Sequence, residues 1–261
     1  MTIFMHELKQ NRKSLIIWTV AIAFLLATCI FLFPEMKGEM DSVSEVFSSM
    51  GGFSEAFGMD KVSFGTLTGF YSVECGNILG LGGAFFAAFT AVTILAKEEK
   101  DHTGEFLLTH PVSRCGILTG KLIAVLVQLA VLNIIIYLVS IGSIALVGEE
   151  IPWKEITLLH TAYLLMQLEL GGICFGVSAF LLKGSIGIGL GIAILLYFLN
   201  IITNISESTE FLKYITPFAY AEGTDIVSNL SLDLPLVLLG VSYGIAGIIC
   251  GYIKYSKKDI A

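Results

Sequence analysis

The segment KEEKDHTGEFLLTHPVSR, residues 97–114, decides how the chain is arranged, because it lies between two long apolar segments. Five charged residues occupy positions 97–101, and a short apolar patch and a proline follow them. Charge is costly in hydrocarbon, so a segment this densely charged is expected to lie in water. The patch Phe106-Leu107-Leu108 is then apolar surface on a water-facing segment, which indicates a docking site for a partner protein.

The composition of the whole chain indicates a membrane protein. Of its 261 residues, 55% are apolar and 14% are charged, and the mean hydropathy is +0.84. Soluble domains carry about 25% charged residues, so the deficit points to lipid as the solvent. We therefore expect an all-α integral membrane protein with one transmembrane domain, residues 1–261. The cysteines and histidines do not have metal-ligand spacing, so we expect no metal site.

Six apolar segments are long enough to span the membrane. Each is near the ~20 residues that cross ~30 Å of hydrocarbon, and helix is the expected structure for runs of this length. The first run is long for a removable signal, and we expect it to be retained. The expected spans are residues 14–33, 70–95, 122–147, 156–181, 186–205 and 236–253.

The distribution of basic residues predicts the orientation of these spans. With the N-terminus inside, the inner segments hold eleven of the 15 Lys and Arg residues, and the outer segments hold four. Short inner loops are enriched in Lys and Arg, so both termini and segment 97–114 are expected to be cytoplasmic. Acidic residues gather in the outer loops. The net charge of −7 is therefore no sign of a nucleic-acid partner.

The first outer loop, residues 34–69, is too long for a simple connection. Its residues Met36, Met40, Val43, Phe47 and Met50 recur at spacings of four and three. This pattern predicts an amphipathic helix that lies on the outer membrane face or packs on the spans. It can serve as an outer lid or as a packing cap.

Glycines four residues apart recur inside the expected spans, a spacing that lets helix backbones approach closely. The five prolines, in contrast, lie at span ends or in loops. This disfavours transporters whose spans are interrupted at an ion site. The glycine pairs are Gly76/Gly80, Gly172/Gly176, Gly187/Gly191, Gly240/Gly244 and Gly247/Gly251.

Two carboxylates lie within the expected spans. Glu169 is near the middle of the fourth span, where an ionised side chain costs at least ~2.5–3.5 kcal/mol. It should face the bundle interior or a wet cavity, with Gln167, Gln128 and Asn133 as candidate neighbours on a translocation path. Glu74 is near the outer end of the second span. The alternatives are a protonated packing residue for Glu169 and a headgroup contact for Glu74.

No constellation of catalytic residues is present. The residues Gly116–Leu122 are superficially similar to a phosphate-binding loop, but three residues separate the glycines where four are required. In addition, Leu122 follows Lys121, where Ser or Thr would hold magnesium. We therefore expect that the chain is not an enzyme and has no nucleotide site or cofactor of its own.

The polar segment resembles the cytoplasmic loop of ABC-2-type transporter permeases. The long first outer loop and residues 216–220 are also similar to this family. Here Thr103-Gly104 stands where many relatives have Gly-Thr, and His110 where many have a smaller or apolar residue. The residues that carry the likeness are Glu98, Glu99, Thr103, Gly104, Glu105, Phe106, Leu107, Leu108, Pro111, Val112, Ser113, Arg114, Gly120 and Lys121.

This resemblance implies a permease subunit of an ATP-driven exporter in a bacterial plasma membrane. A separate ABC ATP-binding subunit would hold ATP and Mg²⁺, and a second permease copy would complete the complex. Residues 97–121 would form a coupling helix, with Arg114 and Lys121 at the inner headgroups. The cargo would be a peptide antibiotic, a drug or a lipid-like compound. The alternatives are an ion- or proton-coupled secondary transporter that uses Glu169, and a non-transporting sensor or assembly subunit.

Overall fold

The computed structural model describes residues 2–38, 46, 50–56, 58–59, 61–97, 113–181 and 185–257. Within these residues all regular structure is helical, and six helices are long and apolar enough to cross a membrane. The expected fold class is thereby confirmed. The six spans are α1 (Thr2–Met36), the continuous run α4 (Leu67–Cys75), η1 (Gly76–Gly80) and α5 (Leu81–Thr93), then α8 (Arg114–Val147), α9 (Trp153–Ser178), α10 (Ile186–Ile205) and α12 (Leu234–Ser256).

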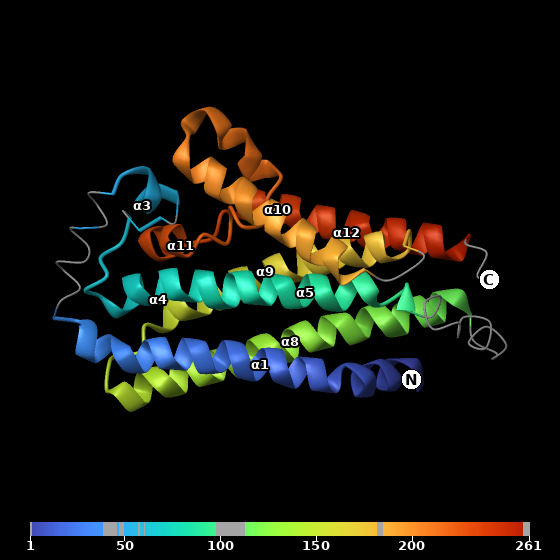
Figure 1. Ribbon diagram of the computed structural model, residues 1–261, viewed down its shortest axis with the longest axis horizontal. Helices are drawn as coiled ribbons and strands as arrows, with labels where there is room; N and C mark the ends of the chain where they lie inside the picture. The colour runs from blue at the N-terminus through green and yellow to red at the C-terminus, as the bar shows by residue number, and fades with distance from the viewer. Residues whose placement is uncertain are drawn as a thin grey trace.

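The long helices run along one axis, and both the start of α1 and the end of α12 lie at one end of the bundle (Figure 1). We call this the terminal end and the opposite one the distal end. The short helices α3 (Gly52–Ala56) and α11 (Gly223–Asn229) lie toward the distal end, and the 3-10 helix η2 (Glu207–Tyr214) follows α10.

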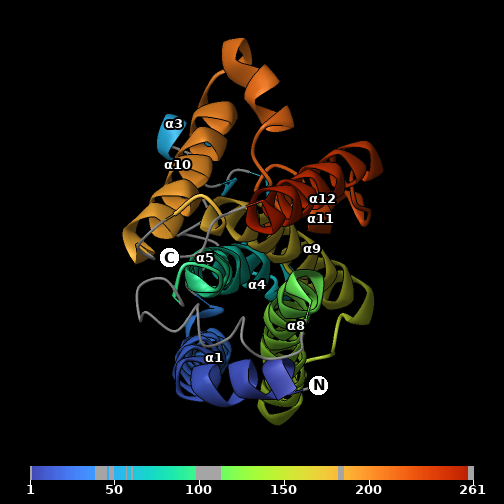
Figure 2. The ribbon, with the colours of Figure 1, turned by 90° about the vertical axis from the view of Figure 1, so that its right-hand side faces the viewer.

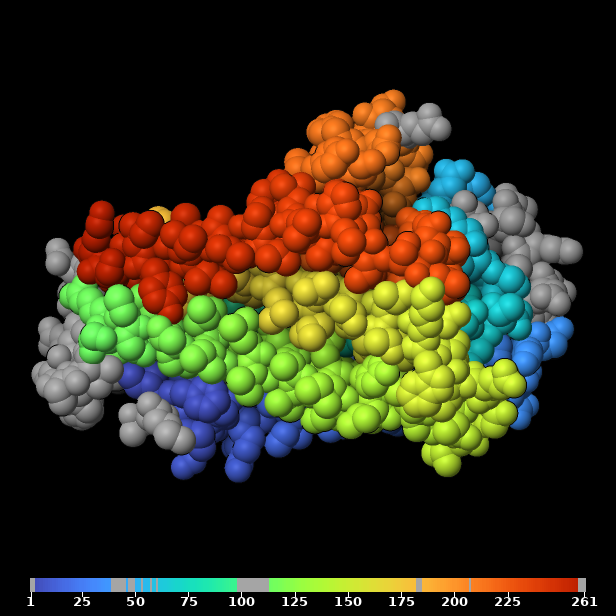
Figure 3. Space-filling model, turned by 180° about the vertical axis from the view of Figure 1, so that it is seen from behind, coloured from blue at the N-terminus to red at the C-terminus, as the bar shows by residue number. Residues whose placement is uncertain are grey.

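Helices α5 and α9 form the centre of the bundle. In each span we consider its apolar stretch of 18 residues. The buried share of this stretch is 61% in the second span and 67% in the fourth, against 17–39% in the other spans. Seen end-on, α1 and α8 lie on one side of this centre, and α10 and α12 lie on the other (Figure 2). From behind, α8, α9 and α12 lie side by side, and the lobe of α10 and η2 stands out from them (Figure 3).

Glycines allow the backbones of α9 and α12 to lie in direct contact. A Cβ at Gly172 would lie 2.6 Å from the carbonyl oxygen of Gly244, and one at Gly176 would lie 2.3 Å from that of Gly247. Only glycine allows the two backbones to lie this close. The glycine spacing thus correctly predicted close helix packing here. In the pair Gly187/Gly191 it did not, because a Cβ at Gly191 would meet no atom within 4 Å.

The second span contains a π-helical turn, η1, which the proline pattern does not indicate. The ring of Tyr163 on α9 packs against this turn. A Cβ at Gly80 would lie 3.2 Å from Tyr163 Cε1, and one at Gly76 would lie 3.2 Å from Tyr163 Oη. Single π turns inside α-helices are frequent at functional sites.

Two spans, α1 and α8, begin at least eight residues before the expected start. Helix α8 begins at Arg114 rather than at residue 122, and the Ser113 hydroxyl caps it by accepting from the Gly116 backbone nitrogen at 3.1 Å. Residues 116–122 are therefore helix and not a phosphate-binding loop. Helix α1 runs from Thr2 to Met36 and includes Pro34, whereas the expected span covered 14–33. Most of the expected outer amphipathic helix lies outside the described residues.

Candidate functional site

One buried carboxylate holds both ends of the polar segment. Glu7 of α1 is 2% exposed and accepts from Lys97 Nζ and, at 2.9 Å, from Lys121 Nζ. Lys97 immediately precedes residues 98–112, and Lys121 follows them on α8. Glu7 therefore ties the segment's two stems to the first helix.

The environment of Lys121 corrects the expectation that this residue lies at the inner headgroups. The Lys121 side chain is 0% exposed, and its ammonium also donates to the Ile94 carbonyl oxygen at 2.7 Å. A buried charge needs an ionic partner and further hydrogen bonds, and both are present here. Lys121 therefore belongs to the core of the terminal end.

The expected coupling residue Arg114 contacts the last span. Its Nη1 donates to the carbonyl oxygens of Ser256, at 3.2 Å, and Tyr255, at 3.5 Å. The last carbonyl groups of a helix lack helical partners and form the negative end of its dipole, so a guanidinium stabilises them. The other expected coupling residues lie outside the described part of the chain: Glu98, Glu99, Thr103, Gly104, Glu105, Phe106, Leu107, Leu108 and Pro111.

Glu169 lies on the face of α9 that packs against α12. It is 3% exposed, and its Oε2 accepts from the Tyr220 hydroxyl at 2.8 Å. Gly240 of α12 leaves the space for this carboxylate, because a Cβ there would lie 2.1 Å from Oε2. The cavity beside Glu169 has a volume of about 10 Å³, which is at most the room for one water molecule.

A much wider groove opens on the other side of Tyr220. Its volume is about 700 Å³, and it lies among the end of α10, η2, α11 and the start of α12. Two ion pairs border it, Lys61–Asp225 and Lys213–Glu210. Tyr220, Lys213 and Leu236 line both the groove and the small cavity at Glu169, so the two spaces are neighbours.

The other expected path residues do not gather around Glu169. The Asn133 amide nitrogen donates to Gln167 Oε1 at 2.7 Å, and the Gln167 amide nitrogen reaches the Leu79 carbonyl oxygen at 3.4 Å. Residues two apart on a helix point to nearly opposite sides, so Gln167 faces α5 and α8 while Glu169 faces α12. Gln128 is buried, and its amide nitrogen donates a hydrogen bond to the Ala124 carbonyl oxygen of its own helix.

Glu74 faces the first span and not the neighbourhood of Glu169. It is half-buried, and the Cys29 thiol of α1 donates to its Oε2 at 3.7 Å. The five expected path residues thus divide among four places. Among the described residues, only the pair Gln167–Asn133 has the direct contact that a shared site requires.

Comparison with known proteins identifies the family. The chain matches the ABC-2 family transporter protein over residues 1–260. It belongs to the ABC-2 family. It is also similar to the uncharacterized protein YhcI of Bacillus subtilis (strain 168), at 26% identity over 217 residues, which cover 73% of this chain and 68% of YhcI. This ABC-2 protein is therefore a multi-pass membrane protein of a transport family.

Two residues of this ABC-2 protein have contacts that the sequence analysis missed, Glu7 and Tyr220. Glu7 is the one acidic residue among the first 34, and this isolated position was a usable signal. Tyr220 belongs to the stretch 216–220 that resembles the family. Its partner Glu169 is 51 residues away, and no local pattern connects the two.

Proposed function

We propose that this ABC-2 protein is the permease subunit of an ATP-driven exporter in the plasma membrane, with both termini in the cytoplasm. A separate ATP-binding subunit supplies ATP and Mg²⁺ and docks on segment 97–114, and a second permease copy completes the transporter. The permease forms the path for a peptide antibiotic, a drug or a lipid-like compound.

The anchoring of the docking segment supports this proposal most directly. Lys97 and Lys121 share Glu7 of α1, and Arg114 holds the end of α12. A force on residues 98–112 is therefore applied to three spans, α1, α8 and α12. Charged hydrogen bonds in a buried setting are shorter and stronger than neutral ones, so the two bonds to Glu7 are the stiffest of these contacts.

The contact between α12 and α9 supplies the second half of the mechanism. Helix α12 is held by Arg114 at its terminal end, and its Gly240 faces the carboxylate of Glu169. Movement of α12 along α9 changes the space at Glu169 and the position of Tyr220 beside it. In this proposal, Tyr220 gates the step between the wide groove and the interior.

Charge reversal on the docking segment tests the ATPase partnership. The double variant Glu98→Lys, Glu99→Lys should lose co-purification with the ATP-binding subunit, because like charges would face each other across the interface. The matched control is Glu149→Lys, Glu150→Lys, an acidic pair that follows α8 at the distal end. The measurement is affinity capture of the native complex from membranes. An intact complex in the first variant would contradict the docking site.

Neutralisation of Glu169 tests the proposed path. Glu169→Gln should lower ATP-driven export into vesicles by about tenfold or more, because the carboxyl group that accepts from Tyr220 is replaced by an amide that cannot ionise. The variant Glu74→Gln is the control, since it removes a carboxylate that faces α1. Wild-type export in Glu169→Gln would remove Glu169 from the path. Export driven by an ion gradient without ATP would favour the secondary-transporter alternative.

A further inference from the structure

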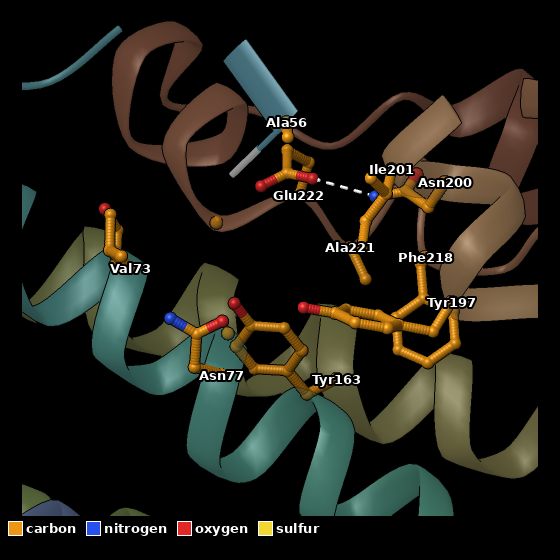
Figure 4. Close-up of a pocket in the computed structure, with 13 residues that line it drawn as sticks. Ala56, Val73, Asn77, Tyr163, Tyr197, Asn200, Ile201, Phe218, Ala221 and Glu222 are labelled. Carbon is orange, nitrogen blue, oxygen red and sulfur yellow. Dashed lines mark hydrogen bonds between the residues drawn. The ribbon is translucent and has the colours of Figure 1, made fainter. Parts of the chain in front are cut away.

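A small polar cavity lies in the distal half of the bundle, apart from Glu169 and from the ion cluster at Glu7 (Figure 4). The π turn η1, α9, α10 and the chain that leads into α11 surround it. Its volume is about 40 Å³, which is enough for a few water molecules or a small ion. Figure 4 shows Glu222 above this space, with the hydroxyl groups of Tyr163 and Tyr197 directed toward it.

The Tyr163 hydroxyl is buried without a hydrogen-bond partner among the described residues. The residue is 1% exposed, and an unpaired buried hydroxyl carries a free-energy cost. Glycine backbone leaves the space around it. A Cβ at Gly223 would lie 2.8 Å from Tyr163 Oη, and one at Gly76 would lie 3.2 Å from it. The chain therefore holds this oxygen open instead of covering it.

A second buried oxygen in the cavity wall is unpaired as well. Asn200 is 5% exposed, and its amide nitrogen donates to Glu222 Oε2 at 3.0 Å. This bond fixes the amide, and the Asn200 carbonyl oxygen has no partner in the described part of the chain. Asn204 donates to the same Oε2 at 3.2 Å, so both amides hold the Glu222 carboxylate in place.

Among the described residues that line the cavity, Glu222 is the one carboxylic acid. No cation of the described residues lies within ion-pair distance of Glu222, and the nearby Lys61 ammonium pairs with Asp225 Oδ1 at 2.8 Å. Burial raises the pKa of the Glu222 carboxyl, and the hydrogen bonds from Asn200 and Asn204 offset part of this rise. Asp225 raises the pKa further, and Lys61 lowers it. A positive ligand would stabilise the ionised form.

Aromatic residues form part of the wall. Tyr163, Tyr197 and Phe218 contribute to it, and the last two lie edge-to-face with ring centroids 5.4 Å apart. Water would satisfy the two unpaired oxygens but would not compensate the carboxylate, and an anion would be repelled by it.

We propose that this cavity binds a small monovalent cation, either an alkali metal ion or the terminal ammonium group of a primary amine. The Glu222 carboxylate supplies the charge, and the unpaired hydroxyl oxygen of Tyr163 supplies a ligand. The wide turn at η1 and Gly223 provide the space. This site requires no ATP-binding partner, so it stands independently of the proposed transport mechanism.

Ligand-dependent thermal stability of the purified full chain in lipid nanodiscs tests the site. A ligand that binds the folded state raises the unfolding midpoint as its concentration rises. The midpoint is measured in NaCl, KCl and methylammonium chloride, each against N-methyl-D-glucamine chloride at equal ionic strength, because that large cation does not fit. We expect a saturable increase with at least one small cation. An alkali-specific increase identifies a metal ion as the ligand, and a methylammonium-specific one identifies an amine.

Two variants locate the effect. Tyr163→Phe removes one unpaired oxygen and keeps the ring, and Glu222→Gln removes the charge. Each should weaken the apparent affinity by about tenfold or more. Tyr137→Phe is the matched control, because its hydroxyl pairs with Thr157 at 3.0 Å outside the cavity. If Glu222→Gln does not fold, titration calorimetry on Tyr163→Phe still decides the result.

Two outcomes would overturn the proposal. The first is an identical midpoint for the wild-type chain in all four salts, which would mean that the cavity holds water alone. The second is an unchanged saturable increase in Tyr163→Phe, which would place the cation elsewhere. Neither measurement involves ATP hydrolysis or export, so failure here leaves the transport proposal untouched.

Discussion

Replacing Glu7 by glutamine is expected to lower the thermal unfolding midpoint of the purified chain by about 10 °C. The substitution leaves the wholly buried Lys121 ammonium without its carboxylate and removes the link to Lys97. Loss of one partner from a buried ion pair costs ~3–5 kcal/mol, because the remaining charge is uncompensated. ATP-dependent export should fall in the same variant, since Glu7 no longer ties both stems of the docking segment to α1, although the bond from Lys97 to Gln10 Oε1, at 2.6 Å, is left.

A surface pair and a double variant give the controls for this result. Glu210→Gln breaks the exposed pair with Lys213 and should change the midpoint little, because water screens an ion pair at the surface. Glu7→Gln combined with Lys121→Met should recover part of the loss, since no charge then stays buried without its partner. A midpoint for Glu7→Gln equal to that of Glu210→Gln would show that the cluster carries no structural role.

The second large effect is expected at the contact of α9 with α12. In Gly176→Leu the new side chain would start from a Cβ 2.3 Å from the Gly247 carbonyl oxygen, so the helices must separate. Forced overpacking costs ~1–3 kcal/mol and shifts the backbone. Because α12 also carries Gly240 beside Glu169, export should be abolished even in protein that still folds. Vesicle export and the unfolding midpoint are the two measurements.

Gly191→Leu is the matched control for this substitution. It also replaces a glycine in a span that belongs to a four-residue pair, but a Cβ there meets no atom within 4 Å. Its unfolding midpoint and export should stay close to those of the unsubstituted chain. Equal losses in both variants would mean that leucine disturbs any span, and that the close backbone contact has no special role.

The apolar runs were sufficient to predict six spans, because a length of ~20 residues in hydrocarbon permits helix and little else. The ends of the helices were harder to predict. Lys121 was placed at the inner headgroups, and the start of α8 was set at residue 122 instead of Arg114. The sequence does not reveal that Glu7, 114 residues earlier, compensates the charge of Lys121. Pairing over such distances depends on the fold.

The residues of the candidate path were likewise predicted only in part: burial follows from the local sequence, whereas the neighbours of a side chain depend on the fold. The position of Glu169 inside a span correctly predicted a buried residue with a polar partner. Its grouping with Gln167 was wrong, because α9 lies at the centre of the bundle and presents different faces to α5 and α12. A hydrophobic pattern reveals one buried face of a helix, but a central helix is buried on several sides. The partner Tyr220 comes from a segment after α10.

The π turn at Gly76–Gly80 has a consequence for movement within the second span. A π turn closes its hydrogen bonds over one residue more than an α turn, so this span holds one residue in excess of a regular helix. Conversion of the turn to α geometry would advance Leu81–Thr93 by about 1.5 Å and rotate it by about 100°. The Gln167 amide, which reaches the Leu79 carbonyl oxygen, and the ring of Tyr163 oppose this slippage. The second span can therefore shift by one residue at this turn, and its contacts with α9 hold it in the observed register.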